Sequence, residues 1–167
     1  MGFWGKVLSK MNDKSGRHVV SASAVIPARR ERVYSLIANY QDGHPRILPK
    51  QFTSLSVEQG GVGAGTVIRV EMSVLGRKQT FRAAITEPEP GRVLAETLLD
   101  GNGAVTTFTV NPGTAPADSK VTISTEFPLR GGIAGVIERI FSTLFLRSIY
   151  VKELENLARV ATGPFGA

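Results

Sequence analysis

Apolar and polar residues alternate with a period of two along the middle of the chain. From Ile68 and again from Phe81, every second residue is apolar over one strand length. Successive side chains of a β-strand point to opposite faces of a sheet, so this alternation predicts strands with one buried face each. Six such strands are predicted near residues 53–59, 66–75, 78–87, 92–99, 104–111 and 120–127. The connections between them are too short for parallel crossovers, so neighbouring strands are predicted to be antiparallel.

The two ends of the domain show other patterns. A run rich in β-branched residues at 18–26 predicts a further strand that ends at Pro27, and helical spacing in residues 28–40 predicts a helix of about three turns. A long amphipathic helix is predicted from Gly132 to about Ala161, with Gly163 and Pro164 after its end. The apolar stripe of this helix is predicted to be Ile133, Val136, Ile140, Leu144, Val151, Leu154 and Ala158.

The predicted order of elements is β-α-β-β-β-β-β-β-α, which places the chain in the α+β class. A sheet with one apolar face must cover it, and the C-terminal helix is the long element that is left to do so. The length of 167 residues suits one domain. We expect residues 1–17 to be a basic amphipathic or flexible leader, residues 18–161 a single ligand-binding domain and residues 162–167 a tail.

Composition narrows the classes of function. The chain has no cysteine and only two histidines, His18 and His44, which excludes disulfide scaffolds and cysteine nucleophiles, and no metal or cofactor is predicted. Seven basic and two acidic residues lie in residues 1–32, so the domain itself lacks the basic face that nucleic-acid binding needs. No apolar run reaches the roughly 18 residues of a membrane span, and no signal-peptide core is present, so the predicted location is cytoplasmic.

The N-terminal residues allow two interpretations. Phe3, Trp4, Val7 and Leu8 share one helical face with lysines elsewhere, which favours an interfacial helix. Such a helix would make weak contact with an anionic membrane surface, or with a partner, through residues 1–14. Two glycines and the short length favour a flexible leader instead.

Several segments resemble a known superfamily. They are ASAVIPARRERVYSLIANY, HPRILP, EQGGVGAGT, EPEPGRVLAE and GGIAGVIERIFSTLFLRSIYVKELENLAR. Together with the order of elements, residues 18–160 resemble the START-like (SRPBCC) superfamily and, within it, the polyketide cyclase/dehydrase-like group. The resemblance implies a helix-grip fold, in which a curved seven-stranded antiparallel sheet wraps around the C-terminal helix with a cavity between them. It also implies a hydrophobic ligand, because members of this group cyclise polyketides or carry lipids or hormones.

Glu96 and Arg147 are charged residues at positions that the pattern predicts to be buried. Glu96 shares a strand face with Leu94 and Leu98, and a carboxylate there is costly unless it is paired or hydrated. Arg147 falls on the apolar stripe of the long helix. One hypothesis is that the two meet in the cavity, or that each meets a polar group of the ligand. The alternative is that Glu96 lies at the rim of the sheet and Arg147 reaches water.

Two further residues are candidates for ligand contact. His44 lies in a loop that the resemblance places near the mouth of the cavity, where it would move protons beside Tyr40, or it is a surface histidine. Tyr34 offers a hydroxyl to the ligand, or it is a core residue with its hydroxyl at the edge. The predicted apolar lining of the cavity is Val70, Met72, Phe81, Leu94, Phe108, Ile140, Leu144 and Val151.

The function predicted from these observations is the binding or carriage of a small hydrophobic ligand such as a lipid or polyketide. One alternative is a polyketide cyclase or aromatase that uses the polar residues of the cavity, and the other is a membrane-associated or partner-binding module. No catalytic residue is assigned. The glycine-rich turn 60–65 lies between two strands and not before a helix, so its glycines are assigned to a turn and not to phosphate binding.

Overall fold

A computed structural model describes residues 17–74, 76–100, 103–128 and 132–164, with the side chains of the last range described from Thr143 onward. The elements are β1 (Arg17–Ile26), α1 (Arg30–Ala38), the short 3-10 helix η1 (His44–Arg46), β2 (Phe52–Gln59), β3 (Val67–Val74), β4 (Arg77–Glu89), β5 (Val93–Leu98), β6 (Val105–Pro112), β7 (Ser119–Pro128) and α2 (Gly132–Thr162). This order confirms the predicted one. The expected leader lies outside the described residues up to residue 16, as does the tail from residue 165.

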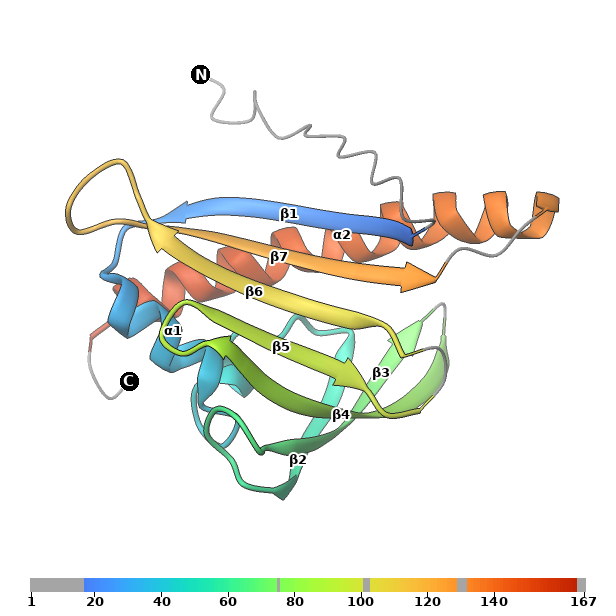
Figure 1. The fold of residues 1–167 in the computed structure, drawn as a ribbon, viewed down its shortest axis with the longest axis horizontal. Helices are drawn as coiled ribbons and strands as arrows, with labels where there is room; N and C mark the ends of the chain where they lie inside the picture. Colours follow the sequence, from blue (N-terminus) through green and yellow to red (C-terminus); the bar gives the residue numbers. More distant parts are fainter. Residues whose placement is uncertain (1–16, 75, 101–102, 129–131, 165–167) are drawn as a thin grey trace.

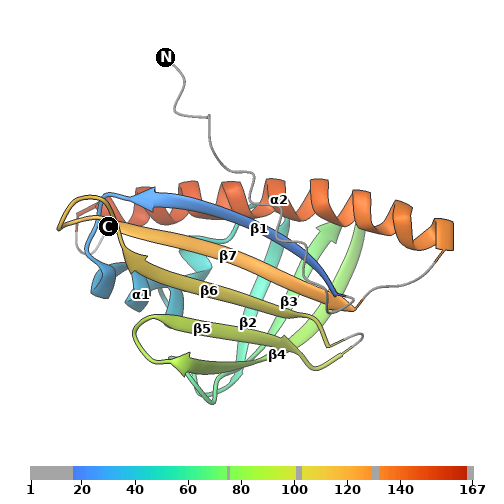
Figure 2. The ribbon, with the colours of Figure 1, turned by 45° about the horizontal axis from the view of Figure 1, so that its top comes forward.

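The strands form one antiparallel sheet in the order β1-β7-β6-β5-β4-β3-β2. From β2 to β7, each strand pairs with the next strand of the chain. The first strand, β1, pairs along its whole length with the last one, β7, from Arg17 opposite Pro128 to Ile26 opposite Ser119. The sheet bends around α2, which runs beside β1 (Figure 1 and Figure 2). The curved seven-stranded sheet with its closing helix is the predicted helix-grip fold.

The buried face of each central strand carries the residues that the alternation predicts. Ile68 and Val70 of β3, Ala83 and Ile85 of β4, Phe108 and Val110 of β6, and Val121 and Ile123 of β7 are all at most 3% exposed. Together with the inner side of α2 they form one core cluster. No helix in the described part of the chain combines the length and the apolarity needed to cross a bilayer.

The prediction for the buried face of α2 was wrong in part. Leu144 is 69% exposed, whereas Ile149, Tyr150, Glu153 and Leu157 are buried. At 3.6 residues per turn, positions nine residues apart lie on opposite sides of a helix, so Leu144 points away from the side that carries Glu153. Apolar residues occur all around the helix between positions 144 and 151, so the spacing alone does not select the face that meets the sheet.

Arg32 of α1 joins the first helix to the end of the last. Its Nε donates to the carbonyl oxygen of Ala161 at 2.5 Å, and its Nη2 donates to that of Gly163 at 3.0 Å. The last carbonyl groups of an α-helix lack partners within the helix and carry partial negative charge, so a guanidinium there is stabilising. The two helices are thereby fixed at the end of the sheet where α1 lies (Figure 1).

Replacing Arg32 by methionine is expected to lower the free energy of unfolding by about 1–3 kcal/mol, because charge-assisted hydrogen bonds to the end of α2 are lost. Arg30→Met is the matched control, since the side chain of Arg30 is 42% exposed and its Nη2 lies 3.8 Å from Oε1 of the exposed Glu31. The control is expected to change the free energy by less than about 0.5 kcal/mol. Urea denaturation measures both, and equal effects of the two substitutions would contradict the role given to Arg32.

Candidate ligand-binding site

A cavity of about 270 Å³ lies between the sheet and α2. Its wall is mostly apolar, and the strands contribute Val70, Met72, Phe81 and Phe108 among other residues. Leu48 and Phe52, on either side of a loop, and Leu146 and Ile149 of α2 continue the apolar wall. Six polar residues complete it, namely His44, Glu96, Thr106, Thr125, Tyr150 and Glu153.

His44 is placed by a turn that the local sequence encodes. The side-chain oxygen of Asn39 accepts hydrogen bonds from the backbone N–H groups of Gln41 and Asp42, which is an Asx turn. Gly43 then passes so close to α1 that a Cβ atom there would lie 2.6 Å from the carbonyl oxygen of Leu36. The turn directs His44 inward, where the residue is 2% exposed.

The ring of His44 has a defined orientation. Its Nδ1 lies 2.7 Å from the carbonyl oxygen of Ile37, and because a carbonyl only accepts, Nδ1 carries the proton. The ring stacks on Tyr40, with centroids 4.5 Å apart, and meets Phe108 edge-on at 5.6 Å. Its Nε2 lies near two carboxyl groups, 3.7 Å from Oε1 of Glu96 and 3.9 Å from Oε1 of Glu153.

Tyr40 links this ring to the sheet. Its hydroxyl donates to Oε1 of Glu96 at 2.6 Å, and its backbone N–H donates to the carbonyl oxygen of Gly61 at 2.9 Å. Burial, followed by the charge of Glu96, raises the pKa of Tyr40 well above its ordinary value, so its hydroxyl stays a donor. Glu96 therefore keeps one partner inside the protein, and its side chain is 18% exposed.

Glu153 is the most unusual polar group of the cavity. It comes from the middle of α2, is 3% exposed, and its Oε1 has no hydrogen-bond partner among the described residues. Burial, followed by the negative charge of Glu96, raises the pKa of Glu153 well above its ordinary value. A carboxyl group in such surroundings favours the neutral, protonated form, because the apolar interior does not solvate its charge.

The remaining polar groups of the cavity bond to one another. The hydroxyl groups of Thr106 and Thr125 lie 2.6 Å apart, and the hydroxyl of Tyr150 also bonds to Thr125. Burial raises the pKa of Tyr150 above its ordinary value. This chain of hydroxyls satisfies its own members, which leaves the carboxyl of Glu153 as the group with an open hydrogen-bonding position.

Of the four polar residues predicted to contact the ligand, two line the cavity and two are not among its described lining residues. Glu96 and His44 both line the cavity. Tyr34 and Arg147 are not among the lining residues of the described part of the chain. The hydroxyl of Tyr34 donates to Oε1 of Glu87 at 2.6 Å, and among the described side chains of α2 the charged one that lines the cavity is Glu153.

The hydrogen bond between Tyr34 and Glu87 stabilises the fold. Oε2 of Glu87 accepts a hydrogen bond from the backbone N–H of Ala64 at 2.9 Å. Gly63 beside it has a φ of 62°, and a Cβ atom there would lie 2.5 Å from Oε2 of Glu87. The glycine-rich turn thus packs against α1 and β4.

Of the predicted apolar lining, Val70, Met72, Phe81 and Phe108 border the cavity. Leu94 is fully buried in the core cluster without being a lining residue, and Val151 packs partly buried against that cluster. Leu144 was wrongly placed, because it lies on the outer side of α2. The side chain of Ile140 lies outside the described residues.

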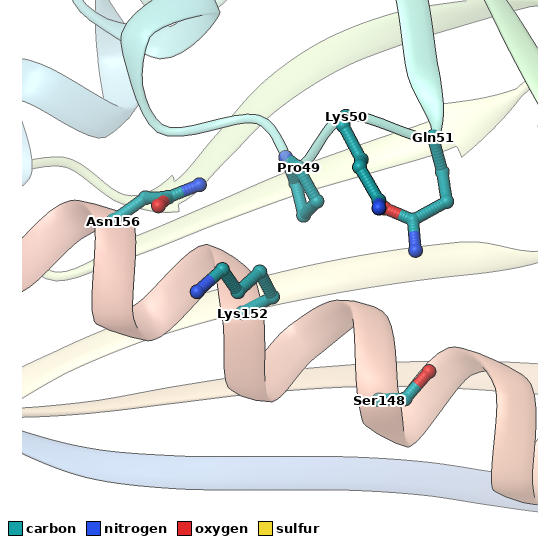
Figure 3. Close-up of a pocket in the computed structure, with 6 residues that line it drawn as sticks. All are labelled: Pro49, Lys50, Gln51, Ser148, Lys152 and Asn156. Carbon is teal, nitrogen blue, oxygen red and sulfur yellow. The ribbon is translucent and has the colours of Figure 1, made fainter.

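A second hollow of about 500 Å³ lies at the surface, between a loop and α2. Figure 3 shows its lining, with residues of successive helix turns facing the loop: Pro49, Lys50, Gln51, Ser148, Lys152 and Asn156. The loop is shared with the inner cavity, which Leu48 and Phe52 line from its other side. Asn156 ties the loop to the helix, donating from Nδ2 to the carbonyl oxygen of Ile47 at 3.1 Å. The groove is therefore the outer side of the wall that encloses the inner cavity, and the inner cavity is the candidate site.

Comparison with known proteins identifies the family of this chain. Residues 17–162 match the family described as polyketide cyclase / dehydrase and lipid transport. The chain belongs to this family. The match runs from the first residue of β1 to the last residue of α2, so it covers every element described above. No curated protein sequence matches the chain.

Several solved structures share the fold of this chain. The solution structure of the KanY protein is 28% identical, covers 89% of this chain and 99% of its own, and has a TM-score of 0.77. A START superfamily protein from Mycobacterium smegmatis is 16% identical, covers 87% and 99%, and has a TM-score of 0.69. The Zhui aromatase/cyclase from Streptomyces sp. R1128 is 16% identical, covers 87% and 93%, and has a TM-score of 0.67.

Glu153 is the residue that sequence reasoning missed. Three of its four neighbours at three and four residues, Ile149, Tyr150 and Leu157, are apolar or aromatic, which is a signal that a helix face is buried. The charges of Lys152 and Glu155 close to it in the sequence favour a solvent-facing position for Glu153, so the pattern did not select this residue. Among the described residues, no group of histidine and acidic side chains is arranged to hold a metal ion.

The buried carboxyl predicts an unusual dependence of stability on pH. The folded protein binds the proton of Glu153 more tightly than the unfolded chain does, so its contribution to the free energy of unfolding falls as the pH rises above the ordinary pKa. Glu153→Gln cannot ionise. Relative to the natural protein, this variant is expected to gain up to about 1.4 kcal/mol per pH unit between pH 5 and pH 8.

Urea denaturation at pH 5, 6, 7 and 8 measures this difference. Among the described residues, the charged and titratable groups that face Glu153 are Glu96, His44, Tyr40 and Tyr150, and they are the same in both proteins. Glu153→Leu also removes the ionisable group and is expected to show the same trend with pH. A difference that stays constant from pH 5 to pH 8 for both variants would contradict the burial of an unpaired carboxyl.

Proposed function

We propose that this protein binds and carries a small, mostly apolar molecule in the cavity between the sheet and α2. The observation that carries the proposal is the cavity itself, in which an apolar wall surrounds a small number of polar groups. Binding sites for small molecules are typically of this kind, with few polar groups that fix the orientation of the ligand. Membership of a family described by polyketide cyclisation, dehydration and lipid transport supports the same conclusion.

The volume of the cavity limits the ligand. Pockets for drug-sized molecules measure roughly 300–1,000 Å³, and this cavity is just below that range at about 270 Å³. An apolar cavity of about 150 Å³ holds one benzene molecule. We therefore propose a ligand with one or two rings, or a chain of similar volume, which contacts Val70, Phe81 and Phe108 and directs its polar end towards His44 and Glu96.

A second candidate function is a cyclase-type reaction, and it is supported by the pairing of an imidazole with a neutral carboxyl group. Because Nδ1 of His44 is held by Ile37, Nε2 faces Glu96 and Glu153 and is the atom that would take or give a proton. Glu153 would act as the matching acid. Turnover that Glu153→Gln and His44→Gln both abolish, in variants that still bind ligand, would favour this function over carriage.

The expectations for membrane contact, nucleic-acid binding and cellular location stay predictions. Residues 1–14 are predicted to make weak contact with a membrane surface, and sedimentation of the full chain with anionic vesicles, compared with a chain that starts at Ser15, tests this. Nucleic acid is not a proposed partner, and the predicted cytoplasmic location awaits fractionation.

Naphthalene is a two-ring apolar probe that tests the cavity as the binding site. Ala83 of β4 lines the cavity, whereas its neighbour Ala84 is half-buried on the opposite face of the strand. Ala83→Leu fills part of the volume and is expected to weaken naphthalene binding at least about tenfold, while Ala84→Leu is expected to leave it unchanged. Two-dimensional ¹⁵N–¹H NMR titration measures both affinities and shows whether each variant is folded. Equal affinities of the two variants would place the binding site elsewhere.

A further inference from the structure

The cavity presents an open hydrogen-bonding position to any molecule inside it. Oε1 of Glu153 lines the cavity, is buried, and has no partner among the described residues. Buried polar atoms in proteins nearly always have a partner, since an unsatisfied one costs free energy. A polar atom of the ligand that reaches this oxygen removes that cost.

The surroundings of Glu153 place the open position between three groups. Nε2 of His44 lies 3.9 Å from Oε1 of Glu153 and 3.7 Å from Oε1 of Glu96. These distances are too long for direct hydrogen bonds. They are short enough that a single oxygen atom placed between Nε2 and one of the two carboxyl groups forms hydrogen bonds of ordinary length to both.

The donors and acceptors around this point select one kind of ligand group. Glu96 only accepts as a carboxylate and already accepts from Tyr40, while a neutral carboxyl at Glu153 both donates and accepts. A hydroxyl also does both, so beside Nε2 of His44, which accepts when the neutral ring holds its proton on Nδ1, it donates to that nitrogen while it accepts from Glu153. A ligand carboxylate only accepts, and its negative charge would face that of Glu96.

A cationic ligand group is disfavoured for a different reason. It would have to leave water for a cavity whose wall is formed by Val70, Phe81, Phe108 and other apolar residues. Glu96 would offset part of that charge, but Glu153 would not, because its burial opposes its ionisation.

We propose that the cavity selects neutral ligands that carry a hydroxyl group, which lies between Glu96, His44 and Glu153, and that it rejects carboxylates. This inference rests on the proposed binding function and adds the chemical class of the ligand's polar group. It separates alcohols, phenols and enols from fatty acids and other carboxylic acids, which are equally apolar over the rest of their length.

Naphthalene and three of its derivatives, all of similar size, test the selection at pH 7. Naphthalene has no polar group, 2-naphthol carries a neutral hydroxyl, 2-naphthoate is an anion and 2-(aminomethyl)naphthalene is a cation. The affinity of the natural protein for 2-naphthol is expected to exceed that for naphthalene about tenfold, which is the worth of one buried hydrogen bond. The affinities for 2-naphthoate and for the cation are expected to fall below that for naphthalene.

Two variants at position 153 link the preference to this side chain. Glu153→Gln keeps a neutral group that donates and accepts, so it is expected to retain the preference for 2-naphthol over naphthalene. Glu153→Leu removes the polar group and its hydrogen bond to the ligand, so most of the preference for 2-naphthol is expected to be lost while the variant still binds naphthalene. NMR titration gives the four affinities and confirms that both variants are folded.

The outcomes separate this inference from the function it rests on. Equal affinities of the natural protein for naphthalene and 2-naphthol would overturn the inference, because water would then satisfy Glu153 equally well, and would leave the binding function intact. Tighter binding of 2-naphthoate or of the cation than of 2-naphthol would also overturn it. Binding of none of the probes would contradict the proposed function itself.

Discussion

The carboxyl group of Glu153 sits inside a structure that offers its Oε1 no partner among the described residues. Moving such a group out of water costs free energy, and the cost is lowest when the group is neutral and highest when it is charged. The protein therefore holds a potential donor in an apolar space beside the charged group of Glu96. A leucine in its place would remove this cost, so Glu153 lowers the stability of the fold. We infer that its role is in ligand binding.

The rest of the site depends on how tightly the groups around this carboxyl are held. Tyr40 is fixed through its backbone to the glycine-rich turn and through its hydroxyl to Glu96, and its ring supports the ring of His44. His44 in turn is fixed through Nδ1 to the end of α1. These contacts join α1, the turn that follows it and the sheet, and they fix the spacing of the polar groups in this structure. A cavity with fixed polar groups orients its ligand without the free-energy cost of ordering them on binding.

Much of the fold was predictable because its signals are local. Alternation at Ile68, Val70 and their successors predicts strands with one buried face, and Gly132 and Gly163 mark the ends of the long helix. The pairing of β1 with β7 joins residues about a hundred positions apart, and no local pattern encodes it. The site was harder to predict, since apolar residues surround α2 near Leu144 and only contact with the sheet decides which side is buried. Glu96 was found because it interrupts an alternating strand, whereas Glu153 lies between charged neighbours and looks like a solvent-facing residue.

The protonation state of Glu153 tests the account most directly. Carbon-13 NMR of the side-chain carboxyl of Glu153, assigned by comparison with Glu153→Gln and followed from pH 4 to pH 8, reports whether that group is neutral or ionised. The account predicts that the signal of the natural protein is that of a protonated carboxyl at neutral pH and that it moves when 2-naphthol is added. A signal that titrates at the ordinary pKa of glutamate and ignores 2-naphthol would contradict it.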